Sequence, residues 1–237
     1  FKVFSEFENK YTESFHTSHF SSDKNYKQKI NDIIANVLFP RLRPLLNNYR
    51  PVFGNWMVKR PDTNNAMPLH ADWTFVNESE FRSLAVWAPL INTNEQNGCF
   101  GLIAGSHWLT PAIRGPKIIQ GDWRNFEKWI SAKGELLPVK AGDVVIYDHA
   151  LLHFSPPNVS DKIRPALNLS CAPTAAQLYH YCMPEGTDKV RKYKVDETSF
   201  FIHYNNFQVP ESGVIEELLE QDSLHVMDNE MELFTST

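Results

Sequence analysis

The amino-acid sequence predicts a mainly β protein, a sandwich or barrel of short strands, with helices flanking it at both ends of the chain. Between residues 52 and 172, short apolar or alternating runs recur, and Gly, Pro, Asn and Asp separate them. Strands at this density, joined by turn residues, are typical of sandwiches and barrels. Ahead of this region, residues 26–49 place their apolar side chains at helical spacing. The chain has 237 residues, and 42% of them are hydrophobic, which suits one domain with a sizeable core.

The helices and strands are expected in a definite order. Residues 26–49 form a helix that is broken at Pro40 and Pro44, because proline interrupts helical hydrogen bonding. Residues 122–131 ("DWRNFEKWIS") form a short amphipathic helix, and residues 212–221 ("SGVIEELLEQ") form another helix with an acidic face. The strands are expected at residues 52–59, 83–90, 99–103, 135–139, 144–147, 151–154 and 165–172.

Charge and cysteine usage limit the classes of partner. The formal net charge of −5 gives no basic field for nucleic acid, and no apolar run approaches the length of a membrane span. Three cysteines without a CxxC pair are typical of reduced thiols, so we expect a cytoplasmic protein. We therefore expect a small-molecule partner, with no nucleic acid and no membrane. The sequence gives no indication of oligomeric state.

The stretch "PLHADW" (residues 68–73) contains a candidate metal-binding pair. In a strand, residues two apart lie on one face, so His70 and Asp72 would point the same way. Alone, such a pair is more often a solvated turn, because two ligands hold a metal weakly. The metal interpretation therefore depends on a third ligand elsewhere in the chain.

Residues 141–165 offer two histidines for that role. His149 and His153 would share a face of an unbroken strand, so alternation does not choose between them. The residues after His153 favour it: Ser155 lies two residues on, and after a turn an antiparallel neighbour would bring Arg164 alongside. A metal beside an arginine fork suits a bound carboxylate, and two histidines with one carboxylate form the ligand set of non-haem Fe(II) oxygenases. His149 is then structural or lies in the outer shell.

The stretch from about residue 52 to residue 173 resembles the phytanoyl-CoA dioxygenase family of Fe(II)/2-oxoglutarate oxygenases. The matching pieces, in order, are "KRPD", "PLHADW", "LAVWAPL", "QNGCFGLIAGSH" and "AGDVVIYDHALLHFSPPNVSDKIRPALNLSCAP". The resemblance implies Fe(II), 2-oxoglutarate and O₂ as cofactors. Its motif makes His70, Asp72 and His153 the iron ligands. Arg164 and Ser155 become the 2-oxoglutarate anchors, and Trp87 lines the co-substrate pocket.

The resemblance also implies a double-stranded β-helix, a cupin-like jelly roll whose eight core strands enclose the site between two sheets. We expect a single oxygenase domain over residues 1–237. Residues 1–50 would give helical support, 51–173 the core with a lid insertion at 114–135, and 174–237 a C-terminal extension with a helix. Residues 74–83 and 114–135 would cover the mouth of the site and select the substrate.

Several other side chains are weaker candidates. Lys59 precedes "PLHADW" on a strand and could point toward the co-substrate. Charged loop residues are usually only solvated, and tryptophans usually pack. The residues proposed to face a substrate are Trp73, Glu78, Arg82 and Arg114, and those given a structural interpretation are His107, His180, His203, Trp108, Trp123 and Trp129. If the loops lie far from the substrate, Tyr179, His180 and Tyr204 are the next polar aromatic residues to consider.

The expected reaction is hydroxylation of an unactivated C–H bond of a small metabolite, an amino acid or a natural-product intermediate, with release of succinate and CO₂. The alternatives are an oxygenase acting on a carrier- or CoA-bound acyl group and a non-catalytic jelly-roll binding module. No basic cluster is evident for the phosphates of CoA. A halogenase would need the carboxylate position vacant, and Asp72 fills it. A zinc hydrolase would have no need of Arg164 and Ser155.

Overall fold

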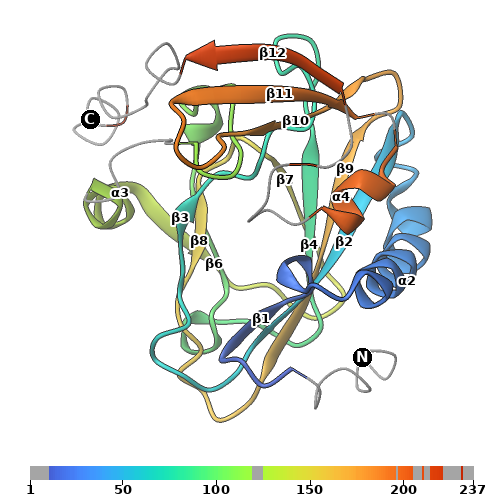
Figure 1. Cartoon of the computed structure of the whole chain (residues 1–237). Helices are drawn as coiled ribbons and strands as arrows, with labels where there is room; N and C mark the ends of the chain where they lie inside the picture. The colour runs from blue at the N-terminus through green and yellow to red at the C-terminus, as the bar shows by residue number, and fades with distance from the viewer. Residues whose placement is uncertain are drawn as a thin grey trace.

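Two antiparallel sheets face each other across the centre of the protein, and a third sheet lies at one end of them (Figure 1). The computed structural model describes residues 11–118, 125–195, 197–204, 210, 214–220 and 231. The five-stranded sheet has the order β1 (Phe15–Thr17), β2 (Tyr49–Lys59), β9 (Arg164–Pro173), β4 (Leu84–Pro89) and β7 (Val145–Asp148). The four-stranded sheet has the order β3 (Met67–His70), β8 (His153–Ser155), β5 (Phe100–Ile103) and β6 (Gly134–Leu137).

The predicted mainly β fold with a jelly-roll core is confirmed. Strands β2, β9, β4 and β7 face strands β3, β8, β5 and β6, which is the two-sheet arrangement of a jelly roll. The third sheet contains β10 (Leu178–Cys182), β11 (Lys189–Val195) and β12 (Val214–Glu220). The described helices are α2 (Lys24–Leu42), α3 (Phe126–Lys133) and α4 (Ser199–His203), with short 3₁₀ turns η1 (Ser18–Phe20), η2 (Glu95–Asn97) and η3 (Ser106–Trp108).

Alternation along β2 and β9 separates the core from the inner face of the five-stranded sheet. Trp56 and Leu169 point outward into a buried cluster with Ile30 and Ile34 of α2. The intervening residues of both strands line an internal cavity. Gly54 permits the close approach of α2, because a Cβ atom there would lie 2.8 Å from Cβ of Ile34.

Helix α2 differs from the expected helix in how it passes Pro40. Asp23 caps its start by accepting a hydrogen bond from the backbone N–H of Tyr26 at 3.0 Å. The helix was expected to break at Pro40, but it continues to Leu42. Pro40 lies in the last turn, where its missing N–H removes only the bond to the carbonyl of Asn36. The break comes instead just before Pro44.

Helix α3 lies within residues 114–135, which were expected to form a lid. The structure instead packs α3 on the outside of the four-stranded sheet (Figure 1). Its Trp129 is 1% exposed and packs in a cluster with Leu69 and Leu152. Each of these leucines precedes a histidine and so faces away from it. The apolar face of α3 is therefore used to cover the sheet, and Trp123 lies outside the described residues.

Residues 212–221 were expected to be helical, and this expectation was wrong. Residues 214–220 form strand β12, which pairs antiparallel with β11 in a register that includes Lys192 with Glu217. The glutamates and leucines of this stretch favour a helix locally, but backbone pairing with an open sheet edge outweighs that preference. The last helix with described bounds is α4 (Ser199–His203), and Met231 is also helical.

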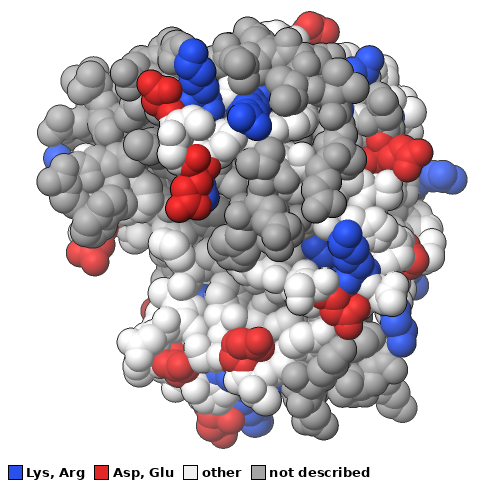
Figure 2. Space-filling model, in the orientation of Figure 1, with Lys and Arg blue, Asp and Glu red and all other residues white. Residues whose placement is uncertain are grey.

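The surface carries charges of both signs. On the face shown in Figure 2, lysine and arginine side chains are interspersed with aspartate and glutamate, and the described part of this face has no large patch of one sign. No helix among the described residues combines the length and the apolar character needed to cross a membrane. Cys99, Cys171 and Cys182 are all buried, and no disulfide joins them.

Candidate metal centre

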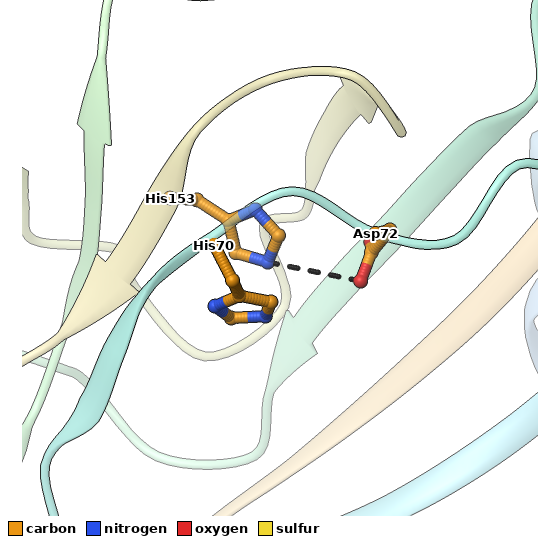
Figure 3. A group of neighbouring side chains, drawn as sticks. All are labelled: His70, Asp72 and His153. Carbon is orange, nitrogen blue, oxygen red and sulfur yellow. Dashed lines mark ion pairs between the residues drawn. The ribbon is translucent and has the colours of Figure 1, made fainter. Parts of the chain in front are cut away.

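Three side chains from the four-stranded sheet and the segment after it converge on one point (Figure 3). His70 ends β3, His153 begins β8, and the two are register partners with ring centroids 4.2 Å apart. Oδ1 of Asp72 lies 4.0 Å from Nε2 of His153. The three residues offer ligand atoms that all lie within 4.8 Å of one another. The structure therefore brings together the residues that the sequence nominated.

Both histidines present a bare nitrogen to this point. Nδ1 of His70 lies 2.8 Å from the carbonyl oxygen of Pro68, and Nδ1 of His153 lies 3.0 Å from that of Leu151. A carbonyl oxygen can only accept, so each Nδ1 carries the proton and each Nε2 keeps a lone pair. This backbone bond from the second ring nitrogen is how metal-binding histidines are normally oriented.

The protonation states also suit a cation. Burial, together with the neighbouring His70, lowers the pKa of His153 to about 4. Burial acts to raise the pKa of Asp72, but the surrounding histidines, His153 first among them, outweigh it, and the pKa is lowered. At neutral pH the cluster therefore has an ionised carboxylate and a neutral His153. These states are the ones a divalent metal needs, because its ligands must be deprotonated.

Asp72 lies two residues beyond the end of β3. Side chains, rather than a neighbouring strand, therefore make hydrogen bonds to the backbone carbonyls around it. Nε of Arg114 donates to the carbonyl oxygen of Asp72 at 2.8 Å, and Nδ1 of His149 donates to that of Trp73 at 3.0 Å. Thr74 exchanges further hydrogen bonds with Arg114: its Oγ1 accepts from the backbone N–H of Arg114, and its own N–H donates to the carbonyl of Arg114. The buried backbone groups of an irregular segment need such partners.

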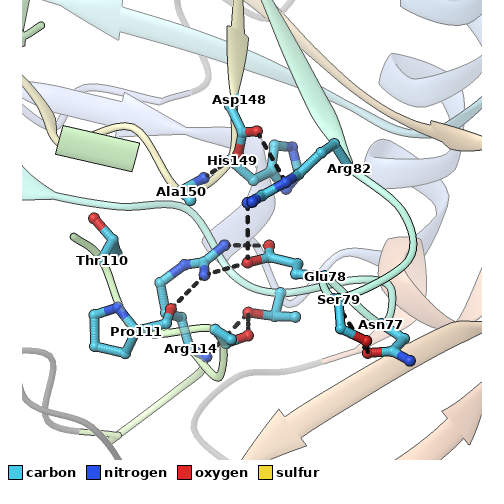
Figure 4. A network of polar contacts seen from close by, with 12 residues as sticks. Asn77, Glu78, Ser79, Arg82, Thr110, Pro111, Arg114, Asp148, His149 and Ala150 are labelled. Atoms are coloured by element: carbon cyan, nitrogen blue, oxygen red, sulfur yellow. Dashed lines mark hydrogen bonds and ion pairs between the residues drawn. The ribbon is translucent and has the colours of Figure 1, made fainter. Parts of the chain in front are cut away.

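Arg114 is itself locked by a buried ion pair (Figure 4). Its Nη2 and Nη1 donate hydrogen bonds to the two carboxylate oxygens of Glu78 at 2.6 Å and 2.8 Å. The side chain of Arg114 is 0% exposed and that of Glu78 is 3% exposed. Arg82 lies farther out, 4.0 Å from Glu78 and 3.9 Å from Asp148. These three charged residues were expected to face a substrate. In the structure they bond one another, and none of them lines the cavity between the sheets.

Tyr147 is a functional neighbour that the sequence reasoning missed. Its hydroxyl accepts a hydrogen bond from Nδ2 of Asn168 at 3.1 Å. The hydroxyl of Tyr147 also bonds the Asp72 carboxylate, which contributes to lowering the pKa of that carboxyl group. The only signal was position: Tyr147 lies in the predicted strand that leads to His149 and His153.

A cavity of about 270 Å³ lies between the sheets and opens onto the three ligands. Arg164, Ser155, Trp87 and Trp73 line it, as their nomination required. The structure corrects one step of that reasoning, because β8 and β9 belong to opposite sheets and are not neighbours. Arg164 therefore reaches the ligands from across the cavity rather than from an adjoining strand.

Arg164 is a buried cation that lacks an anion. It is 2% exposed, and its Nε and Nη1 have no hydrogen-bond partner. Its guanidinium carbon lies 5.8 Å from the ring centroid of Trp87. Burial lowers the pKa of Arg164 to about 10, so it remains charged at neutral pH. Burying an unpaired charge costs free energy. A bound carboxylate would neutralise the charge of Arg164 and accept hydrogen bonds from its guanidinium.

Lys59 sits behind Ser155 and does not line the cavity. It is the register partner of Arg164 and is fully buried. Its Nζ donates to the carbonyl oxygens of Ser155 at 3.1 Å and Pro156 at 2.6 Å, and it also bonds Oγ of Ser155. Burial, with Arg164 nearby, lowers the pKa of Lys59 to about 6. Lys59 therefore orients Ser155. It does not face the cavity itself, so it would influence a bound co-substrate only through Ser155.

The remaining histidines do not join the cluster. His149 lines the cavity, but it is used to hold Trp73, in keeping with a supporting role. His180 is fully buried among aromatic rings, including those of Trp73 and Tyr204. His19, which the sequence analysis did not classify, lines the cavity between Phe53 and Trp73. No regular pattern around His19 could have placed it there.

Comparison with known proteins identifies a family and two curated relatives. A family model described as phytanoyl-CoA dioxygenase (PhyH) matches residues 3–166. The chain is 25% identical over 153 residues to the phytanoyl-CoA dioxygenase domain-containing protein 1 homolog of Dictyostelium discoideum, covering 61% of this chain and 51% of that protein. It is 26% identical over 124 residues to the homolog of Caenorhabditis briggsae, covering 48% and 43%. The chain thus spans about half the length of these curated relatives.

Solved structures share the fold at low sequence identity. The non-heme alpha-ketoglutarate-dependent epimerase SnoN from nogalamycin biosynthesis matches with a TM-score of 0.51 at 18% identity, covering 73% of this chain and 66% of its own. HygX from Streptomyces hygroscopicus, solved with nickel and 2-oxoglutarate bound, matches with a TM-score of 0.51 at 14% identity, covering 73% and 78%. At these identities the likeness shows the fold alone.

Proposed function

The chain belongs to the phytanoyl-CoA dioxygenase family, and from this premise we propose that it is an Fe(II)- and 2-oxoglutarate-dependent oxygenase acting on a C–H bond of a small molecule. One observation carries the proposal. The ligand cluster of His70, Asp72 and His153 and the unpaired guanidinium of Arg164 share a single cavity. A metal site alone would suit many reactions, but a metal site facing a buried, unpaired arginine suits a carboxylate co-substrate.

The residues fit the proposed metal. Two imidazole nitrogens and one carboxylate, held on one side of a cavity, form the facial ligand set of non-haem Fe(II) and leave other coordination positions open. When bound, Fe(II) with 2-oxoglutarate supplies the oxidation of the substrate by O₂, with succinate and CO₂ as co-products. His70 and His153 are held in the binding tautomer by backbone carbonyls, so they need no rearrangement to bind.

The chain's other residues bind and orient the co-substrate. Arg164 would pair with the distal carboxylate of 2-oxoglutarate through its guanidinium, which has no anion beside it in the structure. Ser155, fixed by Lys59, lines the same cavity from the opposite sheet and offers its hydroxyl to the same carboxylate. Trp87 lies against the Arg164 guanidinium and limits its movement. The largely apolar walls exclude water, which strengthens these charge interactions.

Hydroxylation is the outcome that we propose, with an amino acid or a natural-product intermediate as the substrate. A non-catalytic binding module would have no use for two preset histidine tautomers beside an unpaired arginine. A carrier-bound acyl group is the alternative within the same chemistry. It would need an extended approach path to the cavity for the carrier arm.

Metal and turnover measurements test the proposal. Wild-type protein should bind one Fe(II) equivalent anaerobically and, once O₂ is admitted, form succinate and CO₂ from 2-oxoglutarate. Asp72→Ala and His153→Ala should each lose tight metal binding, because two remaining ligands chelate poorly. His149→Ala should retain the metal, since His149 bonds only a backbone carbonyl. The exposed His203→Ala is the control. Metal loss in His149→Ala with retention in His153→Ala would show that the ligand set is wrong, and metal binding without succinate would refute the oxygenase.

A further inference from the structure

We propose that the substrate of this site is a small, uncharged molecule built on one or two rings. This narrows the two substrate classes above to the natural-product intermediate, and it excludes an amino-acid zwitterion and a linear acyl chain. The inference rests on the proposed function, which assigns the metal and Arg164 to the co-substrate. What remains of the cavity wall is then the surface that the substrate meets. That surface is mainly aromatic.

The aromatic side chains come from separate elements and face one another across the cavity. Phe53 lies on β2, Trp73 follows the metal-binding pair, and Phe15 and Phe20 lie on β1 and η1. Phe53 meets Phe75 edge to face at 5.9 Å, and His19 stacks on Phe53 at 5.2 Å. Flat faces and edges set around one space favour a ring, because aromatic pairs stack or meet edge to face.

Charged groups in the wall are already assigned. Among the described residues that line the cavity, Asp72 and Arg164 are the only acidic or basic side chains apart from histidines. His19 lies beside the aromatic wall, and burial lowers its pKa to about 4, so it is neutral at physiological pH. An ammonium or carboxylate group would therefore lose its hydration here without gaining a counter-charge.

The polar groups that remain suit a hydroxyl or carbonyl on such a ring. Asn55 and Asn168 are register partners on β2 and β9, and both line the cavity. Oδ1 of Asn55 already accepts three hydrogen bonds from residues 17–19, and Nδ2 of Asn168 donates to Tyr147, so each amide offers a ligand its other polar atom. These groups give direction to a neutral ligand but do not balance a charge.

The size of the cavity limits the ligand. Its volume of about 270 Å³ lies just below the usual range for ligand sites, and bound 2-oxoglutarate would occupy part of that volume. Phe20 lines the cavity and is also 54% exposed, which places the mouth beside it. One or two rings fit the space between Phe20 and the ligands.

Binding of matched probes tests the inference without requiring turnover. The probes are 2-naphthol, 2-naphthylmethylammonium, 2-naphthoate, phenylalanine and 1-octanol, titrated by calorimetry into full-length protein loaded with Ni(II) and 2-oxoglutarate. We expect 2-naphthol to bind at least about tenfold more tightly than every other probe. Equal or tighter binding of a charged probe, or of 1-octanol, would overturn the inference.

Two variants locate the bound ring. Phe20→Ala and Phe53→Ala should each weaken 2-naphthol binding severalfold, and Phe20 is exposed enough for its loss to leave folding intact. Trp108→Ala, which removes a 74% exposed ring outside the cavity, should change nothing. If both phenylalanine variants bind 2-naphthol as the wild type does, the inference fails.

Failure of the proposed function gives a different pattern. If Ni(II) and 2-oxoglutarate do not bind, the oxygenase proposal is wrong. The comparison of 2-naphthol with 1-octanol in the unloaded protein then still tests the chemistry of the cavity, because neither probe carries a charge that Asp72 or Arg164 could pair with.

Discussion

Individual side chains set the chemistry of this site through the partners that they have and the partners that they lack. His70 and His153 each use Nδ1 to bond a backbone carbonyl, which frees Nε2. Arg164 is the opposite case, a buried guanidinium whose Nε and Nη1 have no partner. A folded chain tolerates such a group when a ligand completes it. The free Nε2 atoms suit a bound cation, and the unpartnered guanidinium suits a bound anion in the same cavity.

Arg164 carries the prediction at this scale. Arg164→Ala should raise the apparent KM for 2-oxoglutarate by a factor of hundreds or more, because a buried charge pair that loses one partner costs on the order of 3–5 kcal/mol. Arg164→Lys should recover part of the affinity, since lysine keeps the charge without the fork. Metal binding should be unchanged in both variants. An unaltered KM in Arg164→Ala would remove this residue from the co-substrate site.

The metal ligands and Arg164 could be nominated from the sequence because each belongs to a short motif at a fixed spacing. No such motif contains Glu78 or Arg114, for which the sequence suggested a substrate contact. They are 36 residues apart, and nothing local shows that they are paired with each other. Their pairing depends on the fold, which brings the loop after the ligands against the loop after η3. A buried ion pair and a substrate contact look alike in a sequence.

At the scale of elements, the decisive feature is the irregular segment that follows β3. Asp72 leaves the strand, so its carbonyl has no place in the sheet and is bonded by Arg114 instead. Arg114 is held by Glu78, Pro111 and Thr74, and so ties this segment to a loop some forty residues away. The ion pair therefore acts as a clamp on a metal-ligand segment, where the sequence suggested a lid.

Substitutions in the Arg114–Glu78 ion pair should affect the free energy of unfolding and the affinity for metal differently. Arg114→Ala leaves Glu78 charged and buried, so the free energy of unfolding should fall by roughly 3–5 kcal/mol in urea denaturation. The double variant Arg114→Met, Glu78→Leu removes both charges and should regain most of that stability. It should not regain metal affinity, because the carbonyl of Asp72 still lacks its donor.

Calorimetric titration with Ni(II) measures the second effect, and Arg82→Ala is the matched control, since Arg82 is 38% exposed and touches neither Asp72 nor Trp73. If the double variant binds metal as tightly as the wild type, Arg114 supports folding without positioning the ligand.

The sequence predicted helices and strands best where buried and exposed residues alternate regularly. It predicted them least well where pairing with a neighbouring strand determines the secondary structure. Strand β9 alternates between the α2 cluster and the cavity, and this pattern is visible in the sequence. Strand β12 has the composition of a helix, and only the open edge of β11 makes it a strand. Pro40 was overestimated as a breaker because its cost depends on how close it lies to the end of the helix.

At the scale of the whole molecule, the two sheets have different tasks. The four-stranded sheet and the segment after it carry the candidate metal ligands, while the five-stranded sheet supplies Arg164, Trp87 and the two asparagines of the cavity wall, Asn55 and Asn168. The proposed chemistry therefore depends on the spacing between the sheets. Lys59 spans this gap, since it lies on β2 and bonds the carbonyls of Ser155 and Pro156 at the end of β8. Its amino group therefore joins the two sheets behind the site.

The burial of Lys59 should make the stability of the whole domain depend on pH. Its pKa is lowered from 10.5 to about 6 by burial and by Arg164. Between these values the unfolded chain binds more protons than the folded chain, so the free energy of unfolding should rise as the pH increases from about 6 toward 10. The contribution of one such group is at most roughly 1.4 kcal/mol per pH unit.

Urea denaturation of the metal-free protein from pH 6 to pH 9 measures this slope. Other groups titrate in the same window, so the informative quantity is the difference between wild type and Lys59→Met, which should grow less stable relative to wild type as the pH rises. Lys140→Met, at an exposed position, should parallel the wild type throughout. A constant difference between wild type and Lys59→Met would mean that Lys59 stays charged in the fold. Its three acceptors would then outweigh its burial, and the two sheets would be joined by an ammonium ion rather than by a neutral amine.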